Sequence, residues 1–216
     1  MAKTLKIDFV SDIVCPWCAV GLGALEQALA RLKGEVEAEI TFQPFELNPQ
    51  MAPEGENVVE HIGRKYGSTP EQSRRNREAL KARGEEVGFA FNYTDDSRIW
   101  NTFDAHRLLH WAETEGKQGE LKRALLKANF TDQRDPSNHD VLVEVAGNVG
   151  LDPERARAVL SSGEFTAEVR QREAFWQEAG ITAVPSVIVA GKYLIQGGQP
   201  AEVFEQALRQ IAAEPA

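Results

Sequence analysis

The sequence is poor in cysteine, with only two among its 216 residues, and it contains no apolar run long enough to span a membrane. Its first residues also lack the apolar core of a secretory signal peptide, because charged side chains interrupt the run from Leu5 to Val10. Basic residues are outnumbered, 24 against 33 acidic ones, and the net charge of −9 argues against nucleic acid or an anionic membrane surface as a partner. We therefore expect a cytoplasmic protein, in which a structural disulfide is not favoured.

The two cysteines that are present form the pattern Cys15-Pro16-Trp17-Cys18, after a strand-like run and before a helical pattern. This order places both sulfurs where a helix begins, and the free N–H groups there stabilise a thiolate at Cys15. Proline is tolerated at the first helical position. Two intervening residues allow one sulfur to attack a disulfide and the other to resolve the mixed disulfide. The pattern therefore predicts a redox site.

The cysteine pair has two other interpretations, a zinc site and a pair of inert core residues. The pair could contribute half of a zinc site, completed by His106 and His110, which are spaced four residues apart on a predicted helix. The gap to these histidines is far longer than in compact zinc modules, and no second Cys-x-x-Cys exists. The cysteines could also be inert core residues. The strand, Cys-x-x-Cys and helix in succession favour the redox interpretation over both, so we predict no metal.

The periodicity of apolar residues predicts an α/β fold in two parts. A strand over 4–10, a helix over 17–33 and a strand over 36–46 form a βαβ unit, in which the two strands should be parallel. Residues 56–163 are almost entirely helical in pattern. Further elements are expected as helices over 70–87, 99–115, 118–129, 138–149, 153–163, 165–179 and 200–212, and as strands over 186–190 and 193–195.

Without its middle, the chain should form a mixed four-stranded sheet with helices on both faces. We expect residues 1–55 and 164–216 to build this sheet domain, and residues 56–163 to be an inserted all-helical domain.

With these elements and its Cys-x-x-Cys, the sequence resembles a known family, the FrnE-like, DsbA-family thiol-disulfide oxidoreductases. Members of that family have a thioredoxin-like fold with a helical insertion. The resemblance covers essentially the whole chain. The stretches that carry it are residues 11–18, 44–49, 101–107, 180–186 and 197–200.

The resemblance implies a role for each residue of the Cys-x-x-Cys. Cys15 is expected to be the exposed attacking thiol, and Cys18 the buried resolving one. Pro16 and Trp17 are expected to modulate their reactivity. Since Trp17 stands where periplasmic relatives have a histidine, the stabilising charge of an imidazolium is absent and the disulfide should be a weaker oxidant.

The resemblance also implies residues outside this pattern. Pro185 matches the cis-proline that faces the two sulfurs, and the backbone of Val184 is expected to pair with a substrate chain in the manner of an added strand. Asn101 and His106, from the insertion, are expected to lie over the cysteines and to form one wall of the substrate cleft.

The sequence departs from the thioredoxin pattern on its first strand. Phe9 occupies the position of a buried carboxylate that would deprotonate the resolving cysteine. Asp12 or Glu46 could replace that carboxylate if the fold brings either one near Cys18.

A second family shares the expected fold, the kappa-type glutathione transferases and 2-hydroxychromene-2-carboxylate isomerases. They are similar to this chain around 44–45 and Asn101, but they use a serine at the position of Cys15 and bind glutathione. The cysteine pair favours a dithiol oxidoreductase acting on a disulfide-bearing protein or a small thiol. We expect no resident cofactor, with glutathione a candidate co-substrate, and a monomer or homodimer.

Overall fold

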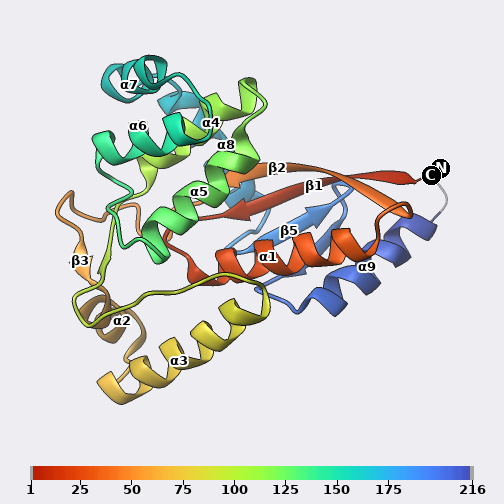
Figure 1. Ribbon diagram of the computed structural model, residues 1–216, viewed down its shortest axis with the longest axis horizontal. Coiled ribbons are helices and arrows are strands. Elements are labelled where there is room, and N and C mark those ends of the chain that lie inside the picture. Colours follow the sequence, from red (N-terminus) through yellow and green to blue (C-terminus); the bar gives the residue numbers. More distant parts are fainter. Residues whose placement is uncertain (1, 215–216) are drawn as a thin grey trace.

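A mixed four-stranded sheet forms the centre of the computed structural model, which describes residues 2–214 (Figure 1). The order of strands is β2-β1-β5-β6, with β1 and β2 parallel and the other neighbours antiparallel. This is the predicted sheet, including its parallel βαβ unit. The strands are β1 (Lys3–Ser11), β2 (Val36–Pro44), β5 (Ser186–Val189) and β6 (Tyr193–Gln196).

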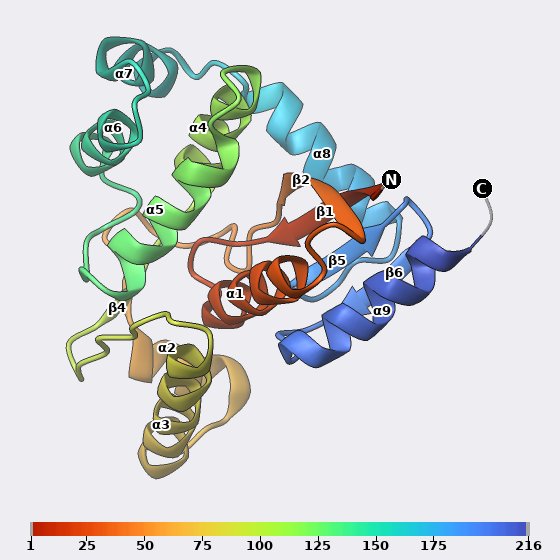
Figure 2. The same ribbon diagram turned by 45° about the vertical axis from the view of Figure 1, so that its right-hand side comes forward.

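Helices cover both faces of the sheet and make up most of the insertion (Figures 1 and 2). Their bounds agree to within a few residues with the ranges predicted for them, apart from the helix predicted over 99–115, and the helix Val58–Tyr66 has no predicted range of its own. They are α1 (Pro16–Arg31), α2 (Val58–Tyr66), α3 (Pro70–Glu86), α4 (Phe103–Thr114), α5 (Gln118–Phe130), α6 (His139–Asn148), α7 (Pro153–Ser162), α8 (Thr166–Glu178) and α9 (Ala201–Ala213).

The alternation of residues along β1 decides which helix covers which face. Ile7 and Phe9 belong to the core that the sheet shares with α1 and α9. Val10 points to the opposite face, where it packs in a cluster with Trp176 of α8. Successive side chains of a strand alternate between faces, so the apolar residues of β1 bury both sides of the sheet.

The insertion is helical except for one pair of two-residue strands, β3 (Glu56–Asn57) and β4 (Arg98–Ile99). The helix expected from Ile99 therefore begins later, at Phe103, because Ile99 pairs with Glu56 in this small sheet. Thr69 and Gln72 form a capping box at the start of α3.

The two parts of the insertion differ in how they are packed. Helices α4 to α7 enclose a core of their own, which Ile13 joins from the loop after β1. Helix α3 contributes Leu80 to the core of the sheet domain instead, and Phe130 at the end of α5 joins that core as well. No helix in residues 2–214 combines the length and apolar character required to cross a bilayer.

Candidate active site

The two cysteines lie at the junction of β1 and α1, as the sequence predicts. Cys15 is the N-cap residue of α1, Pro16 is its first residue, and the amide of Cys18 donates to the Cys15 carbonyl at 3.0 Å. Both thiols are free. Only 3% of Cys15 is exposed and none of Cys18, so the prediction that Cys15 is exposed is wrong. Trp17, by contrast, is 42% exposed.

The loop before β5 packs directly against the cysteines. The bond between Val184 and Pro185 is cis, as predicted, and the thiol of Cys15 donates to the Val184 carbonyl at 3.6 Å. Gly21 of α1 allows this approach, because a Cβ there would stand 3.1 Å from Cγ of Pro185. A larger residue at Gly21 would push the loop away from the sulfurs.

A fully buried carboxylate, that of Asp12, lies just before the cysteines. Its Oδ1 accepts from the amide of Ile13 and its Oδ2 from the amide of Leu47, each at 2.7 Å, and Nε2 of His106 is 3.3 Å from Oδ1. Burial alone would raise the pKa of Asp12, but these hydrogen bonds, that of His106 foremost, hold it below its usual value. Asp12 is therefore a buried anion.

A polar stripe on α5 faces the sheet domain and contains a buried lysine. At one end of the stripe, Gln118 bonds both the amide and the carbonyl of Phe42, at 2.9 and 3.0 Å. At the other end, Asn129 donates to the carbonyl of Ile13 at 3.3 Å. Lys122 lies between them on the same face of the helix and is 1% exposed. The two flanking contacts direct Lys122 towards the cysteines.

The charge of Lys122 acts on the resolving cysteine. Burial, a hydrogen bond to Cys15 and the negative charge of Cys15 raise the pKa of Cys18 well above its usual value, while the ammonium of Lys122 opposes this rise. Burial lowers the pKa of Lys122, while a thiolate at Cys18, were it formed, and the carboxylate of Asp12 oppose that decrease. Cys18 is thus held as a thiol, and the ammonium of Lys122 is the cation that would stabilise its thiolate.

Sequence reasoning missed Lys122 and could not choose between two carboxylates. The available signal was a lysine within the apolar stripe of a helix, four residues before buried Leu126. Of the two carboxylates considered, Asp12 is the one whose charge acts on Lys122, whereas Glu46 forms an ion pair with Arg170.

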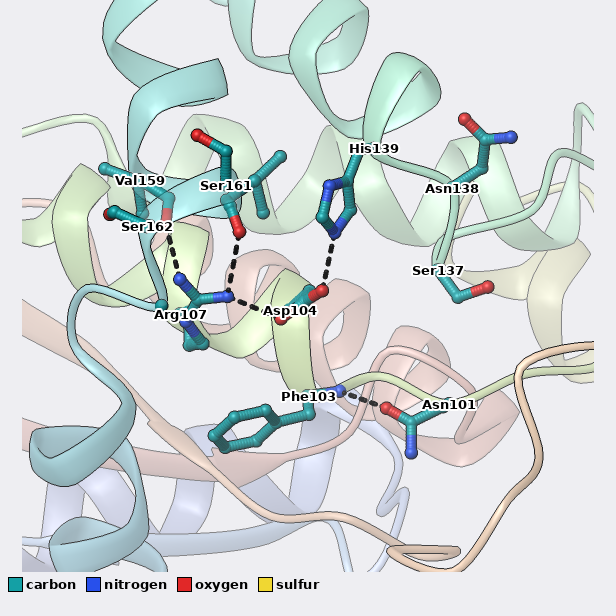
Figure 3. A network of polar contacts seen from close by, with 12 residues as sticks. Asn101, Phe103, Asp104, Arg107, Ser137, Asn138, His139, Val159, Ser161 and Ser162 are labelled. Carbon is teal, nitrogen blue, oxygen red and sulfur yellow. Dashed lines mark hydrogen bonds and ion pairs between the residues drawn. The ribbon is translucent and has the colours of Figure 1, made fainter.

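The prediction that Asn101 and His106 form a wall of the cleft is wrong. His106 is buried, and its Nε2 donates to the carbonyl of Phe45 at 3.1 Å in addition to its contact with Asp12. The side-chain oxygen of Asn101 accepts from the amide of Phe103 at 3.0 Å, at the start of α4 (Figure 3). Both side chains use their polar atoms within the protein, and neither lines the cavity beside Cys15.

Helices α2 and α3 form that wall instead. They enclose a cavity of about 740 Å³ together with the loop around Val184 and the start of α1, a volume suited to a small organic ligand. Cys15, Pro16, Trp17 and Val184 all line it. The residues that α2, α3 and the segment after them contribute include Val58, Val59, His61, Ile62, Lys65, Tyr66, Ser73, Asn76, Arg77, Leu80, Tyr93 and Ile99.

The two helix histidines do not join the cysteines. His110 packs against the ring of Phe165 at 5.0 Å between centroids, and His106 contacts Asp12. Among residues 2–214, no group of three or more His, Cys, Asp or Glu side chains is placed to hold a metal ion.

A Cys-x-x-Cys at a helix N-terminus, facing a cis-proline loop on this sheet, defines the thioredoxin-like class of proteins. A model of the DSBA-like thioredoxin domain matches residues 6–209, and the chain belongs to that family. The predicted DsbA-family membership and fold are thereby confirmed, and the FrnE-like branch stays a prediction.

Individual relatives agree with this assignment. The chain is 37% identical to a probable DsbA oxidoreductase, SCO1869, of Streptomyces coelicolor, with a TM-score of 0.91 over 98% of this chain and 92% of that one. It is 30% identical to an uncharacterized protein, YwbO, of Bacillus subtilis (strain 168), over 95% of this chain and 96% of the relative. A 2-hydroxychromene-2-carboxylate isomerase shares the fold at 16% identity, with a TM-score of 0.72 over 95% of each chain. Family and relatives together support an oxidoreductase.

Proposed function

We propose that the protein is a thiol-disulfide oxidoreductase that exchanges disulfides through Cys15 and Cys18. The observation that carries the proposal is the asymmetry of the two sulfurs. Cys15 lines a cavity at the N-terminus of α1, whereas Cys18 is enclosed and has a raised pKa. A nucleophile that borders a cavity, followed by a protonated partner, is the arrangement that two-step exchange requires.

The disulfide exchange proceeds in two steps. The thiolate of Cys15 attacks one sulfur of a substrate disulfide, RS–SR′, and R′S⁻ leaves as Cys15–S–SR forms. Cys18 then loses its proton to the departing RS⁻ as its sulfur attacks that of Cys15, which closes the Cys15–Cys18 disulfide. Two electrons pass from the dithiol to the substrate. Two equivalents of a low-molecular-weight thiol, with glutathione as the candidate, restore the dithiol.

The buried charges near Cys18 support the second step. A thiolate at Cys18 lacks water to stabilise it, and the ammonium of Lys122 is the positive charge that acts on it. Asp12 in turn favours the charged form of Lys122. Both act through charge rather than by contact with substrate, so we treat them as positioning residues.

The substrate side of the site has backbone groups as well as a cavity. The Val184 carbonyl, 3.6 Å from the Cys15 sulfur, borders the path by which a substrate sulfur would approach. This geometry supports Val184 as the backbone contact for the substrate, and Pro16, Trp17 and Pro185 as the residues that shape the approach. Reduction by a thiol pool fits a cytoplasmic location, which we propose for the protein.

Substitution of each cysteine by serine tests the proposal. Cys15→Ser should abolish reduction of an insulin or small-molecule disulfide, by about a thousandfold or more, because the nucleophile is lost. Cys18→Ser should accumulate Cys15–S–SR, detectable by mass spectrometry as an adduct that a thiol removes. Cys15→Ser with unchanged turnover would disprove the proposal.

A glutathione-dependent isomerase is the second candidate, favoured by the cavity beside Cys15 and by the shared fold of the chromene carboxylate isomerase. Such an enzyme binds glutathione and does not need a second cysteine. Isomerisation of 2-hydroxychromene-2-carboxylate by Cys18→Ser with added glutathione would therefore support the isomerase. Disulfide reduction that is lost in Cys15→Ser, without any such isomerisation, would support the oxidoreductase.

A further inference from the structure

The charges that line the cavity differ in sign from those of the protein as a whole. The chain has a net charge of −9, yet the described residues around the cavity include Lys65 and Arg77 and no aspartate or glutamate. In an acidic protein this local excess of positive groups favours an anion inside the cavity over the bulk surface.

Lys65 is the positive group whose charge is least neutralised by neighbouring carboxylates. Its ammonium donates to the carbonyl of Leu47 at 2.8 Å and to Oδ1 of Asn48 at 2.7 Å, which are both neutral acceptors. No carboxylate of residues 2–214 forms an ion pair with it. Arg77, by contrast, is paired with Asp95 at 2.8 Å. Lys65 therefore offers an unneutralised charge at the exposed rim of the cavity.

Three further polar atoms in the lining have no partner among the described residues. They are Nε2 of His61, Oγ of Ser73 and Nδ2 of Asn48. His61 is 8% exposed and Ser73 is 6% exposed. A buried polar group without a partner costs about 1–3 kcal/mol, so three in one cavity indicate that a ligand completes them.

The orientation of His61 is set by its other nitrogen. Nδ1 lies 2.6 Å from a carboxylate oxygen of Glu56, and the pKa of that carboxyl is lowered, chiefly by this hydrogen bond. An ionised carboxylate only accepts, so Nδ1 carries the proton and Nε2 points away from Glu56. Nε2 can then accept from a ligand.

The remaining lining is apolar. Val58, Ile62, Leu80 and Ile99 supply aliphatic surface, and Tyr93 adds an aromatic ring. The cavity thus combines a large apolar wall with a few polar groups, the combination that orients small organic ligands. An extended polar peptide would leave this apolar wall without contacts.

From these groups we infer that the substrate class is a small disulfide that carries both a carboxylate and an apolar body. The carboxylate is held by Lys65, Ser73 and Asn48 while the apolar part packs against α2 and α3, and the disulfide lies against Cys15. This inference rests on the proposed exchange chemistry, in which RS–SR′, the Cys15 thiolate and the Cys18 thiol give R′S⁻, RSH and the Cys15–Cys18 disulfide. Glutathione disulfide has the carboxylates without the apolar body.

Three disulfides test the requirement for a carboxylate separately from the requirement for an apolar body. Dithiobis(nitrobenzoate) is anionic and aromatic, bis(nitrophenyl) disulfide is aromatic and neutral, and glutathione disulfide is anionic without an apolar group. Each kcat/KM is divided by the rate constant of the same disulfide with free dithiothreitol, which removes differences in intrinsic reactivity. We expect the normalised value for dithiobis(nitrobenzoate) to exceed both others by about tenfold or more.

Substitution of the rim lysine gives the second measurement. Lys65→Met should reduce the normalised kcat/KM for dithiobis(nitrobenzoate) by about tenfold and leave that for the neutral disulfide unchanged, whereas Lys65→Arg should retain it. Lys33→Met removes one exposed positive charge elsewhere and should change neither value.

Two outcomes would overturn the inference. They are equal normalised rates for the three disulfides, and equal losses for the charged and neutral aromatic compounds in Lys65→Met. A wild-type enzyme that reduces all three without preference would retain the proposed function and lose only this inference. Failure to reduce any disulfide would remove the proposed function itself.

Discussion

The two parts of the insertion differ in how they are packed and in how their polar atoms are paired. Helices α4 to α7 enclose their own apolar core, and α5 presses its polar stripe against the sheet domain. Helices α2 and α3 have few buried residues and leave polar atoms of His61 and Ser73 without partners beside the cavity. Figures 1 and 2 show the two parts on opposite sides of the α1 N-terminus. The comparison indicates that the bundle holds a buried charge that acts on the cysteines, while α2 and α3 line the cavity in which we propose that substrate binds.

The bundle contains an extended network of paired polar groups, in contrast to α2 and α3, although Nδ1 of His110 in α4 has no partner among residues 2–214. Arg107 of α4 is buried, and its guanidinium donates to Asp104 at 2.6 Å and to the carbonyl of Val159 (Figure 3). It also donates to the carbonyl of Glu164 at 2.8 Å. Asp104 also contacts Nε2 of His139 at 2.6 Å. This network connects α4 to α6 and α7. Substitutions at four buried polar residues, Arg107, Asp12, Lys122 and Ser73, test the comparison.

The largest effect is expected from Arg107→Met. The change leaves the carbonyls of Val159 and Glu164 without their donor, and should cost about 3 kcal/mol of unfolding free energy. Urea denaturation followed by circular dichroism measures it. Arg157→Met, which removes an exposed arginine from the same bundle, serves as control and should cost far less. Equal losses in the two variants would contradict the structural role of the network.

Asp12→Asn should have the next largest effect, about 2 kcal/mol at pH 7, because the new NH₂ group faces an amide that needs an acceptor. The loss should depend on pH. The folded pKa of Asp12 is depressed, so its contribution is present above the unfolded pKa of about 4 and is lost as the pH falls through the folded value.

The difference in stability between wild type and Asp12→Asn should therefore shrink below about pH 4. Urea titrations at several pH values measure it, with Asp96→Asn at an exposed position as control. A difference that is constant with pH would show that Asp12 is not a stabilised anion.

Lys122→Met should slow catalysis while it stabilises the fold. Loss of the ammonium raises the pKa of Cys18 further, so release of the mixed disulfide should slow about tenfold at neutral pH and its pH profile should move to higher pH. Stability should increase, since a buried charge is replaced by an apolar side chain. Rapid-quench analysis of the adduct measures the rate.

Lys127→Met is the matched control for Lys122→Met, because Lys127 lies on the same helix but is exposed and paired with Asp132. It should leave the pH profile where it is. An unchanged profile in Lys122→Met would show that the lysine has only a packing role.

The smallest effect is expected from Ser73→Ala in α3. Its hydroxyl has no partner among residues 2–214, so its removal should leave stability unchanged or raise it by about 1 kcal/mol. Asn129→Ala in the bundle removes a bonded amide instead and should lower stability by about the same amount. Thermal unfolding of the pair measures both. If Ser73→Ala proved the more destabilising, α2 and α3 would not be the part built for binding.

The sequence by itself determined the elements and the location of the chemistry. Pro16 at a helix start and the Thr69–Gln72 capping box act within one turn of chain, and the alternation along β1 follows from the geometry of a strand. Such local signals predict where Cys15 and Cys18 lie on the fold.

Only the tertiary structure decided what surrounds the two sulfurs. Asp12 and Lys122 are 110 residues apart, and α5 could have turned Lys122 to solvent if Gln118 and Asn129 had not found backbone partners on the sheet domain. The burial of Cys15 and the choice of α2 and α3 rather than α4 as the cavity wall depend equally on how distant elements pack. Periodicity tells which face of a helix is apolar, but the burial of a charge is a property of the assembled neighbours, because only their dipoles and charges can compensate for the lost water.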